Sequence, residues 1–213
     1  MDIKFIDTDK IYPFLMIDNF YTEEEQELIW TELEFLRGNL ERADTATAVD
    51  KDGLRLAAKW SVFLDDVFKD RQFSNVFRFK GKMFNEEVLE AYNKIPSYQT
   101  YVNCNQDNTL LNYYEDGDYY KPHYDAMHHS CIVWFIREPK VWKGGEFLFE
   151  DSKIEIECKH NRMVLFPSFY LHGARAVKMK KKDKNKGLGR YAMSTFLDIF
   201  HEYPSFLKES KQV

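Results

Sequence analysis

The chain has 213 residues, of which 44% are hydrophobic and 16% aromatic, and its formal net charge at neutral pH is −5. A hydrophobic content this high excludes a disordered chain, and the length allows one domain with a substantial core. The acidic net charge provides no general attraction to nucleic acid or to an anionic membrane, and it disfavours nucleic acid as a partner.

The sequence also predicts a cytoplasmic protein that does not act at a membrane. It contains no run of about 18 apolar residues that could span a bilayer, and the first residues lack the apolar segment of a signal peptide. The three cysteines, Cys104, Cys131 and Cys158, are an odd number and form no CxxC motif. We expect them to be free thiols in a reducing compartment.

The N-terminal part of the chain has the signals of a helix. Thr22 and Glu25 have the spacing of a capping box, in which each side chain accepts a hydrogen bond from the other residue's backbone N–H. Apolar residues then recur at helical spacing, namely Leu28, Ile29, Leu33 and Leu36. Gly38 is typical of a helix end. The sequence therefore predicts a helix between Thr22 and Gly38.

The next segment, residues 39–56, is polar and mixed, and we expect a loop there. From residue 57 to residue 92 apolar residues recur without clean alternation, which favours helices. Val88, Leu89 and Tyr92 fit one helix face. Residues 1–95 are accordingly predicted to form a mainly helical flank.

After Pro96 the pattern changes to short runs of aromatic and aliphatic residues separated by Gly, Pro, Asp and Lys, as in strands joined by turns. The runs cover residues 109–114, 131–136, 145–149, 154–158, 162–166 and 191–200. Helices followed by many strands indicate an α+β fold, with helices packed on an antiparallel sandwich or barrel. We predict a single domain over residues 1–213, with its β core at 96–203 and a tail at 204–213.

One stretch of the β region carries a candidate metal site. His123 and Asp125 are two residues apart, so on an extended strand their side chains leave the same face. His172 follows an apolar run that ends at Pro167. Two imidazoles and one carboxylate form the triad that suits non-haem Fe(II), and they leave the other coordination positions open.

Four motifs in this order carry a family resemblance. They are Tyr114-x-x-Gly117-x-x-Tyr120-x-Pro122-His123-x-Asp125, then Gly144-Gly145-Glu146-Phe147, then Phe166-Pro167-Ser168 with His172, and finally Gly189-Arg190-Tyr191-Ala192. With them the chain resembles the prolyl-4-hydroxylase-like 2-oxoglutarate/Fe(II)-dependent dioxygenases. The segment 13–20 also resembles the entry segment of that family. The resemblance implies a double-stranded β-helix, or jelly-roll, with iron at one mouth.

The resemblance assigns His123, Asp125 and His172 as iron ligands and catalytic residues. It implies Fe(II), 2-oxoglutarate and O₂ as cofactor and cosubstrates, and ascorbate as a further requirement. Halogenating relatives replace the carboxylate by a small residue, so the presence of Asp125 favours a hydroxylase. A non-catalytic metal- or ligand-binding β-barrel is the alternative class.

A cation must hold the distal carboxylate of the cosubstrate, and Arg190 is the candidate because guanidinium binds carboxylate through two parallel hydrogen bonds. Ser194 shares a strand face with Arg190 and could add a hydroxyl contact. Lys181 or Lys182, in the lysine-rich segment 178–187, is the alternative cation. That segment is either a solvated hairpin or a basic rim that attracts an acidic substrate or nucleic acid.

The other expected contacts also come from the resemblance. Tyr114 matches the family tyrosine that donates to the cosubstrate carboxylate, and Tyr113 replaces it if the strand is slipped by one residue. Trp134 would flank the cosubstrate or belong to the core, and Tyr120 would lie near iron and substrate.

The expected activity is 4-hydroxylation of proline in a peptide or protein, with release of succinate and CO₂. The alternative substrate is a free amino acid or another small molecule. Loops 39–56 and 126–130 would determine the specificity.

Overall fold

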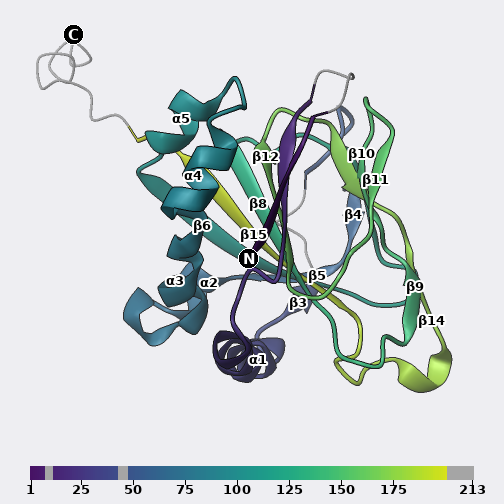
Figure 1. The fold of residues 1–213 in the computed structure, drawn as a ribbon. Helices are drawn as coiled ribbons and strands as arrows, with labels where there is room; N and C mark the ends of the chain where they lie inside the picture. The colour runs from purple at the N-terminus through teal and green to yellow at the C-terminus, as the bar shows by residue number, and fades with distance from the viewer. Residues whose placement is uncertain (8–11, 43–47, 201–213) are drawn as a thin grey trace, which may run out of the picture.

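The computed structural model describes residues 1–7, 12–42 and 48–200. A large antiparallel sheet forms its middle layer (Figure 1). In order across this sheet the strands are β1 (Asp2–Ile6), β2 (Phe14–Asp18), β12 (Arg162–Pro167), β8 (His129–Phe135), β15 (Arg190–Asp198), β6 (Gln106–Tyr114), β5 (Trp60–Phe63) and β3 (Glu41–Arg42).

Two smaller antiparallel sheets complete the β structure. The five-stranded one has the order β11 (Ile154–Ile156), β10 (Phe147–Phe149), β13 (His172–Ala174), β7 (Tyr119–His123) and β4 (Ala57–Ala58). The two-stranded one pairs β14 (Val177–Met179) with β9 (Trp142–Gly144).

Helices cover the face of the large sheet that lies opposite the five-stranded sheet (Figure 1). They are α1 (Glu23–Arg37), α2 (Leu64–Val67), α3 (Asn75–Phe79), α4 (Glu86–Tyr92) and α5 (Tyr98–Val102). Three 3₁₀ turns are η1 (Arg71–Phe73), η2 (Lys80–Phe84) and η3 (Lys181–Asp183). None of these helices is long and apolar enough to cross a membrane.

The alternation of side chains along the central strands divides the core into two parts. On β15, Tyr191 and Met193 pack into the cluster under the helices, whereas Ala192 belongs to the cluster between the two larger sheets. On β8, Val133 and Trp134 are divided in the same way. Because successive residues of a strand face opposite sides, one run of apolar residues serves both layers.

The predicted N-terminal helix is confirmed. The Thr22 hydroxyl accepts a hydrogen bond from Glu25 N at 3.3 Å, and the Glu25 carboxylate accepts one from Thr22 N at 2.8 Å, which completes the capping box. Of the apolar positions, Ile29, Leu33 and Leu36 are buried. The helix ends at Gly38, as the sequence predicted.

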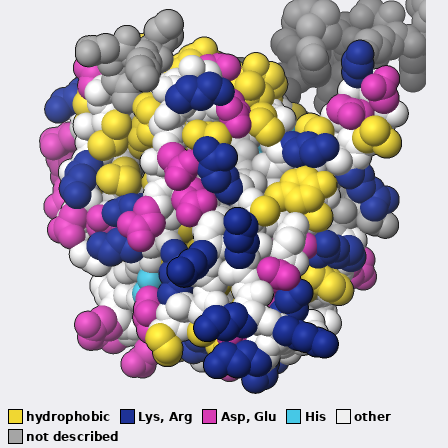
Figure 2. All heavy atoms as spheres, turned by 90° about the vertical axis from the view of Figure 1, so that its right-hand side faces the viewer, with side chains coloured by type: hydrophobic (Ala, Val, Ile, Leu, Met, Phe, Trp, Pro, Cys, Tyr) yellow, Lys and Arg dark blue, Asp and Glu magenta, His cyan; other side chains and the backbone are white. Residues whose placement is uncertain are grey.

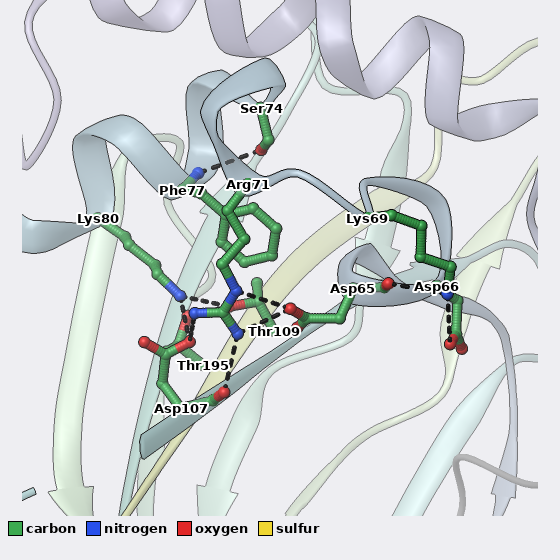
Figure 3. Close-up of polar contacts among 10 residues, drawn as sticks. All are labelled: Asp65, Asp66, Lys69, Arg71, Ser74, Phe77, Lys80, Asp107, Thr109 and Thr195. Atoms are coloured by element: carbon green, nitrogen blue, oxygen red, sulfur yellow. Dashed lines mark hydrogen bonds and ion pairs between the residues drawn. The ribbon is translucent and has the colours of Figure 1, made fainter. Parts of the chain in front are cut away.

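A polar cluster fixes the helical layer to the first residues of strand β6 in the large sheet (Figure 3). The Arg71 guanidinium donates to Asp65 Oδ1 at 2.7 Å and to Asp107 Oδ1 at 2.8 Å. The Lys80 ammonium forms an ion pair with Asp107 and donates to the Thr109 hydroxyl at 3.2 Å. These contacts join the segment from α2 to η2 to strand β6.

The expected α+β class and jelly-roll core are confirmed, but the flank differs from the prediction. Residues 1–95 contain five strands as well as helices, and both larger sheets use them. Residues 57–63, which were expected to be helical, form β4 and β5, because β5 pairs with β6 and β4 with β7. This pairing with distant strands outweighs the weak local pattern. The predicted tail at 204–213 lies outside the described residues.

Candidate functional site

Two neighbouring strands of the five-stranded sheet bring the predicted triad of His123, Asp125 and His172 together. His123 ends β7, His172 begins β13, and the two residues are direct partners in the pairing of these strands. Asp125 follows β7 by two residues. The potential ligand atoms of the three side chains all lie within 4.8 Å of one another.

Backbone carbonyls set the orientation of both imidazoles. His123 Nδ1 lies 2.9 Å from the carbonyl oxygen of Lys121, and His172 Nδ1 lies 2.8 Å from that of Tyr170. A carbonyl oxygen only accepts, so each Nδ1 carries a proton, and Nε2 is the ring nitrogen left for a metal. The two Nε2 atoms lie 3.6 Å and 3.4 Å from the carboxylate oxygens of Asp125.

Two further contacts fix Asp125. Ser130 Oγ donates to Asp125 Oδ2 at 2.5 Å, and Asp125 N donates to the carbonyl of Ser168 at 3.2 Å. Burial disfavours the charged carboxylate, but the imidazoles of His172 and His123 outweigh it and hold the pKa of Asp125 well below its usual range. Burial lowers the pKa of His123, so this imidazole is neutral at pH 7.

The triad therefore presents two imidazole nitrogens and one carboxylate, a set that fits Fe(II). Among the described residues no fourth His, Cys, Asp or Glu joins this group. A structural zinc site would close its coordination shell with a fourth protein ligand. The arrangement can hold a metal ion and leave coordination positions for other molecules.

The triad lies in a cavity, here called the central cavity, that Arg190, Tyr114 and Ser194 also line. Arg190 is 2% exposed and pairs with no carboxylate among the described residues. Its Nε donates to Cys158 Sγ at 3.2 Å, whereas its Nη1 is buried without a hydrogen-bond partner. The guanidinium carbon lies 4.6 Å from the ring centre of Tyr114. A buried cation in this state is suited to an anion that enters the cavity.

The structure separates the alternatives that the sequence left open for this part of the site. Tyr114 lines the central cavity, whereas Tyr113 faces the helices and donates to Glu115 at 2.6 Å. Lys181 and Lys182 lie exposed in η3 and do not line the central cavity.

Trp134 and Tyr120 also lie close to these groups. Trp134 is fully buried, its ring centre is 5.9 Å from the Arg190 guanidinium carbon, and its Nε1 has no hydrogen-bond partner in the described part of the chain. The ring of Tyr120 stacks on the imidazole of His123 with 3.6 Å between ring centres. Its hydroxyl accepts a hydrogen bond from Ala48 N at 2.9 Å.

Sequence reasoning did not identify three polar residues of this region. Lys59 and Asn112 line the central cavity, and Cys158 contacts Arg190. The available signal was the Lys59-x-Ser61-x-Phe63 alternation, which places a lysine on the inner face of a strand. Because residues 57–63 were predicted to be helical, this alternation was not interpreted as that of a strand.

An outer groove adjoins the central cavity and contains His123 and Asp125 as well. The predicted specificity loops contribute Ala48 and Met127 to it, and residues 43–47 of the first loop lie outside the described residues. The aromatic side chains of Phe63 and Tyr124 line it too.

The lysine-rich segment 178–186 lies elsewhere. It spans β14, η3 and the turn before Arg190, whereas the outer groove contacts β15 at Phe196, near the other end of that strand. Figure 2 shows Lys and Arg side chains gathered over the lower part of the face that carries β9 and β14, with acidic side chains among them. Lys184, in the lysine-rich segment, forms an ion pair with Asp116 at 2.6 Å. A solvated hairpin describes this segment better than a basic rim around the groove.

Residues 109–198 match the model of the 2OG-Fe(II) oxygenase superfamily. A search of curated protein sequences found no match. Among solved structures, a Pseudomonas putida prolyl-4-hydroxylase is similar at a TM-score of 0.61 and 14% identity, covering 90% of this chain and 95% of that one.

A Trichoplax adhaerens prolyl hydroxylase, solved with a peptide fragment of the hypoxia inducible factor oxygen degradation domain, has a TM-score of 0.61 and 13% identity, with coverage of 87% and 83%. A prolyl 4-hydroxylase from Phytophthora capsici has a TM-score of 0.52 and 18% identity, with coverage of 95% and 67%. At these identities the structures establish the fold, and they agree with the resemblance derived from the motifs.

Proposed function

We propose that this chain, which carries a domain of the 2OG-Fe(II) oxygenase superfamily over residues 109–198, is a 2-oxoglutarate- and Fe(II)-dependent hydroxylase. One observation carries the proposal beyond the family match. The central cavity combines an open triad of metal-binding type with a buried guanidinium that has no carboxylate partner among the described residues. A merely structural metal site has no need of that cation.

The residues have distinct roles in this proposal. His123 and His172 bind the iron through Nε2, and Asp125 binds it through its carboxylate. Arg190 binds the distal carboxylate of 2-oxoglutarate, and Tyr114 and Ser194 add hydroxyl contacts, since all three line the same cavity. Trp134 does not line the cavity; its ring centre lies 5.9 Å from the Arg190 guanidinium carbon, so we propose that it supports the cosubstrate-binding cation from behind.

When bound, the iron and 2-oxoglutarate supply the activation of O₂ and the oxidation of a C–H bond, with release of succinate and CO₂. The protein contributes the fixed geometry of three ligands, backbone carbonyls that orient both imidazoles through Nδ1, and a largely buried cavity. The hydrogen bond from the Ser130 hydroxyl orients the carboxylate of Asp125. Ascorbate, which would keep the iron reduced, is part of the proposal.

For the substrate we propose proline in a peptide or protein. The support is the fold shared with prolyl hydroxylases and the outer groove, whose aromatic side chains suit a peptide better than a small polar metabolite. Tyr120 lies at the junction of the groove and the central cavity, where it would contact the substrate. A free amino acid or other small molecule is the second candidate, because the central cavity holds two buried cations. A cytoplasmic location is proposed too, supported by three cysteines that form no disulfide.

The test is mass spectrometry of proline-containing peptides and free amino acids incubated with enzyme, Fe(II), ascorbate, 2-oxoglutarate and air, with succinate measured in the same tube. Hydroxylation on proline that is lost in His123→Ala and kept in His160→Ala would support the peptide substrate. Succinate formation without peptide oxidation would keep the oxygenase and reject these peptides. Absence of metal-dependent 2-oxoglutarate binding by the folded protein would refute the function and favour the non-catalytic class.

A further inference from the structure

Lys59 occupies the point at which the chain passes from one sheet to the other. β4 ends at Ala58 in the five-stranded sheet, and β5 begins at Trp60 in the large sheet. The lysine between them therefore projects its side chain into the space between the sheets, where it lines the central cavity. Only 2% of Lys59 is exposed, which is rare for a lysine without an acidic partner.

The ammonium group of Lys59 has few partners there. It donates to Asn112 Oδ1 at 2.7 Å and lies 4.5 Å from the ring centre of Tyr120. The described part of the chain offers it no other hydrogen-bond acceptor and no ion pair. Since an ammonium group has three N–H donors, Lys59 retains donors for another group inside the cavity.

The charges around Lys59 leave it uncompensated. Burial lowers the pKa of Lys59 to about 7, the carboxylate of Asp125 raises it, and the guanidinium of Arg190 lowers it. Asp125 and Arg190 have partners in the proposed function, because Fe(II) takes the carboxylate and 2-oxoglutarate takes the guanidinium. One divalent iron, one dianionic cosubstrate, Asp125 and Arg190 together have no net charge. The ammonium of Lys59 is then the surplus charge in a buried site.

We propose that Lys59 is a second carboxylate-binding cation of the central cavity, in addition to Arg190. The inference rests on the proposed function, since that function accounts for the other charges. A carboxylate can reach Lys59 from two sources. One is the carboxylate of 2-oxoglutarate next to its keto group, and the other is a carboxylate on the substrate itself, as in a free amino acid.

The first arm of the test measures binding of 2-oxoglutarate and of pyruvate to the Mn(II)-loaded protein by titration calorimetry. Pyruvate keeps the keto acid and lacks the distal carboxylate. If Lys59 binds the metal-side carboxylate, Lys59→Met weakens both compounds about tenfold or more, the usual effect of losing a charge-assisted hydrogen bond. Arg190→Met weakens only 2-oxoglutarate. Lys143→Met, at an exposed position of β9, serves as the matched control and leaves both unchanged.

The second arm uses protein saturated with Mn(II) and 2-oxoglutarate and titrates it with propionate and with uncharged propionamide. If Lys59 binds a carboxylate of the substrate, the wild-type complex binds propionate in preference to propionamide. Lys59→Met then loses that preference and keeps its affinity for 2-oxoglutarate. Either pattern supports the proposal and identifies the source of the carboxylate.

The proposal is overturned if Lys59→Met changes neither the affinity for the two keto acids nor the preference for propionate over propionamide. Lys59 would then only support Tyr120 and Asn112. Should that variant fail to fold, a crystal structure of the wild-type protein with Mn(II), 2-oxoglutarate and propionate decides. A carboxylate oxygen within about 3.2 Å of Lys59 Nζ supports the inference, and its absence overturns it. Failure of the proposed function is a separate result, namely wild-type protein that folds and does not bind 2-oxoglutarate with Mn(II).

Discussion

Replacing Arg190 by methionine should stabilise the ligand-free protein and at the same time remove its stabilisation by 2-oxoglutarate. The guanidinium is 2% exposed, its Nη1 has no hydrogen-bond partner, and the described residues offer it no carboxylate. Methionine fills a similar volume without a charge. Replacing buried charges by apolar residues of similar volume is commonly neutral or stabilising, by about 1–4 kcal/mol. We expect the lower half of this range, since the Tyr114 and Trp134 rings partly compensate the cation.

For a chain of this length each kcal/mol shifts Tm by roughly 2–4 °C, so the ligand-free variant should melt about 2–10 °C above the wild type. At 2-oxoglutarate concentrations of 100 times Kd, the wild type with Mn(II) should gain about 2.7 kcal/mol, or roughly 5–11 °C. The variant should lose most of that gain. Thermal unfolding followed by circular dichroism, with and without ligand, measures both effects.

Arg175→Met is the matched control. Arg175 pairs with Glu155 at an exposed site, so its replacement should change stability by less than about 1 kcal/mol and keep the ligand effect. The reasoning is refuted if Arg190→Met lowers the ligand-free Tm while the 2-oxoglutarate shift stays at its wild-type size. Arg190 would then be a structural residue, and another cation would bind the cosubstrate.

Three further outcomes can be measured. Asp125→Ala should weaken Mn(II) binding by at least about 100-fold in calorimetry and abolish succinate formation, because a direct ligand matters more than the surrounding shell; near-normal Mn(II) affinity would exclude the triad. Burial lowers the pKa of His129 to about 4. As the pH falls from 6.5 to 4, His129 is therefore protonated in the unfolded chain before it is protonated in the folded one, and the free energy of unfolding should fall by up to about 3 kcal/mol. His129→Phe should flatten the urea-denaturation profile over that range, and an unchanged slope would contradict the assignment. Asp18 accepts two hydrogen bonds from Arg162, at 2.6 and 3.0 Å, which lower its pKa. This pair stabilises the fold fully above about pH 4 and is lost as Asp18 is protonated at lower pH, so Asp18→Asn should cost about 1–3 kcal/mol at pH 7 and progressively less as the pH falls below 4.

Local signals in the sequence were sufficient for several elements. Helix α1 could be predicted because its capping residues and its apolar residues all lie in one local segment, from Thr22 to Gly38. The structure has both the cap and the buried apolar face. Strands β6, β8, β10, β11, β12 and β15 could be predicted because their apolar runs are separated by turn residues, whereas the short strands β7, β9, β13 and β14 were not among the predicted runs. His123 and Asp125 could be paired because they are two residues apart, and the motif order connected them to His172. Sequence thus predicted the resemblance that the match over residues 109–198 supports, and it named His123, Asp125, His172 and Arg190, which all line the central cavity.

Tertiary structure decided what depends on contacts between distant segments. Residues 57–63 form strands because β6 and β7 pair with them, and no local pattern expresses that pairing. The register of β6 against β15 places Tyr114 opposite Arg190 and turns Tyr113 toward the helices. Lys59 is buried because it lies between two sheets, and the identity of a residue as lysine does not reveal that position in the fold. The sequence determines which chemical groups are present, whereas the environment that gives each group its charge state and partners arises only when distant strands pack together.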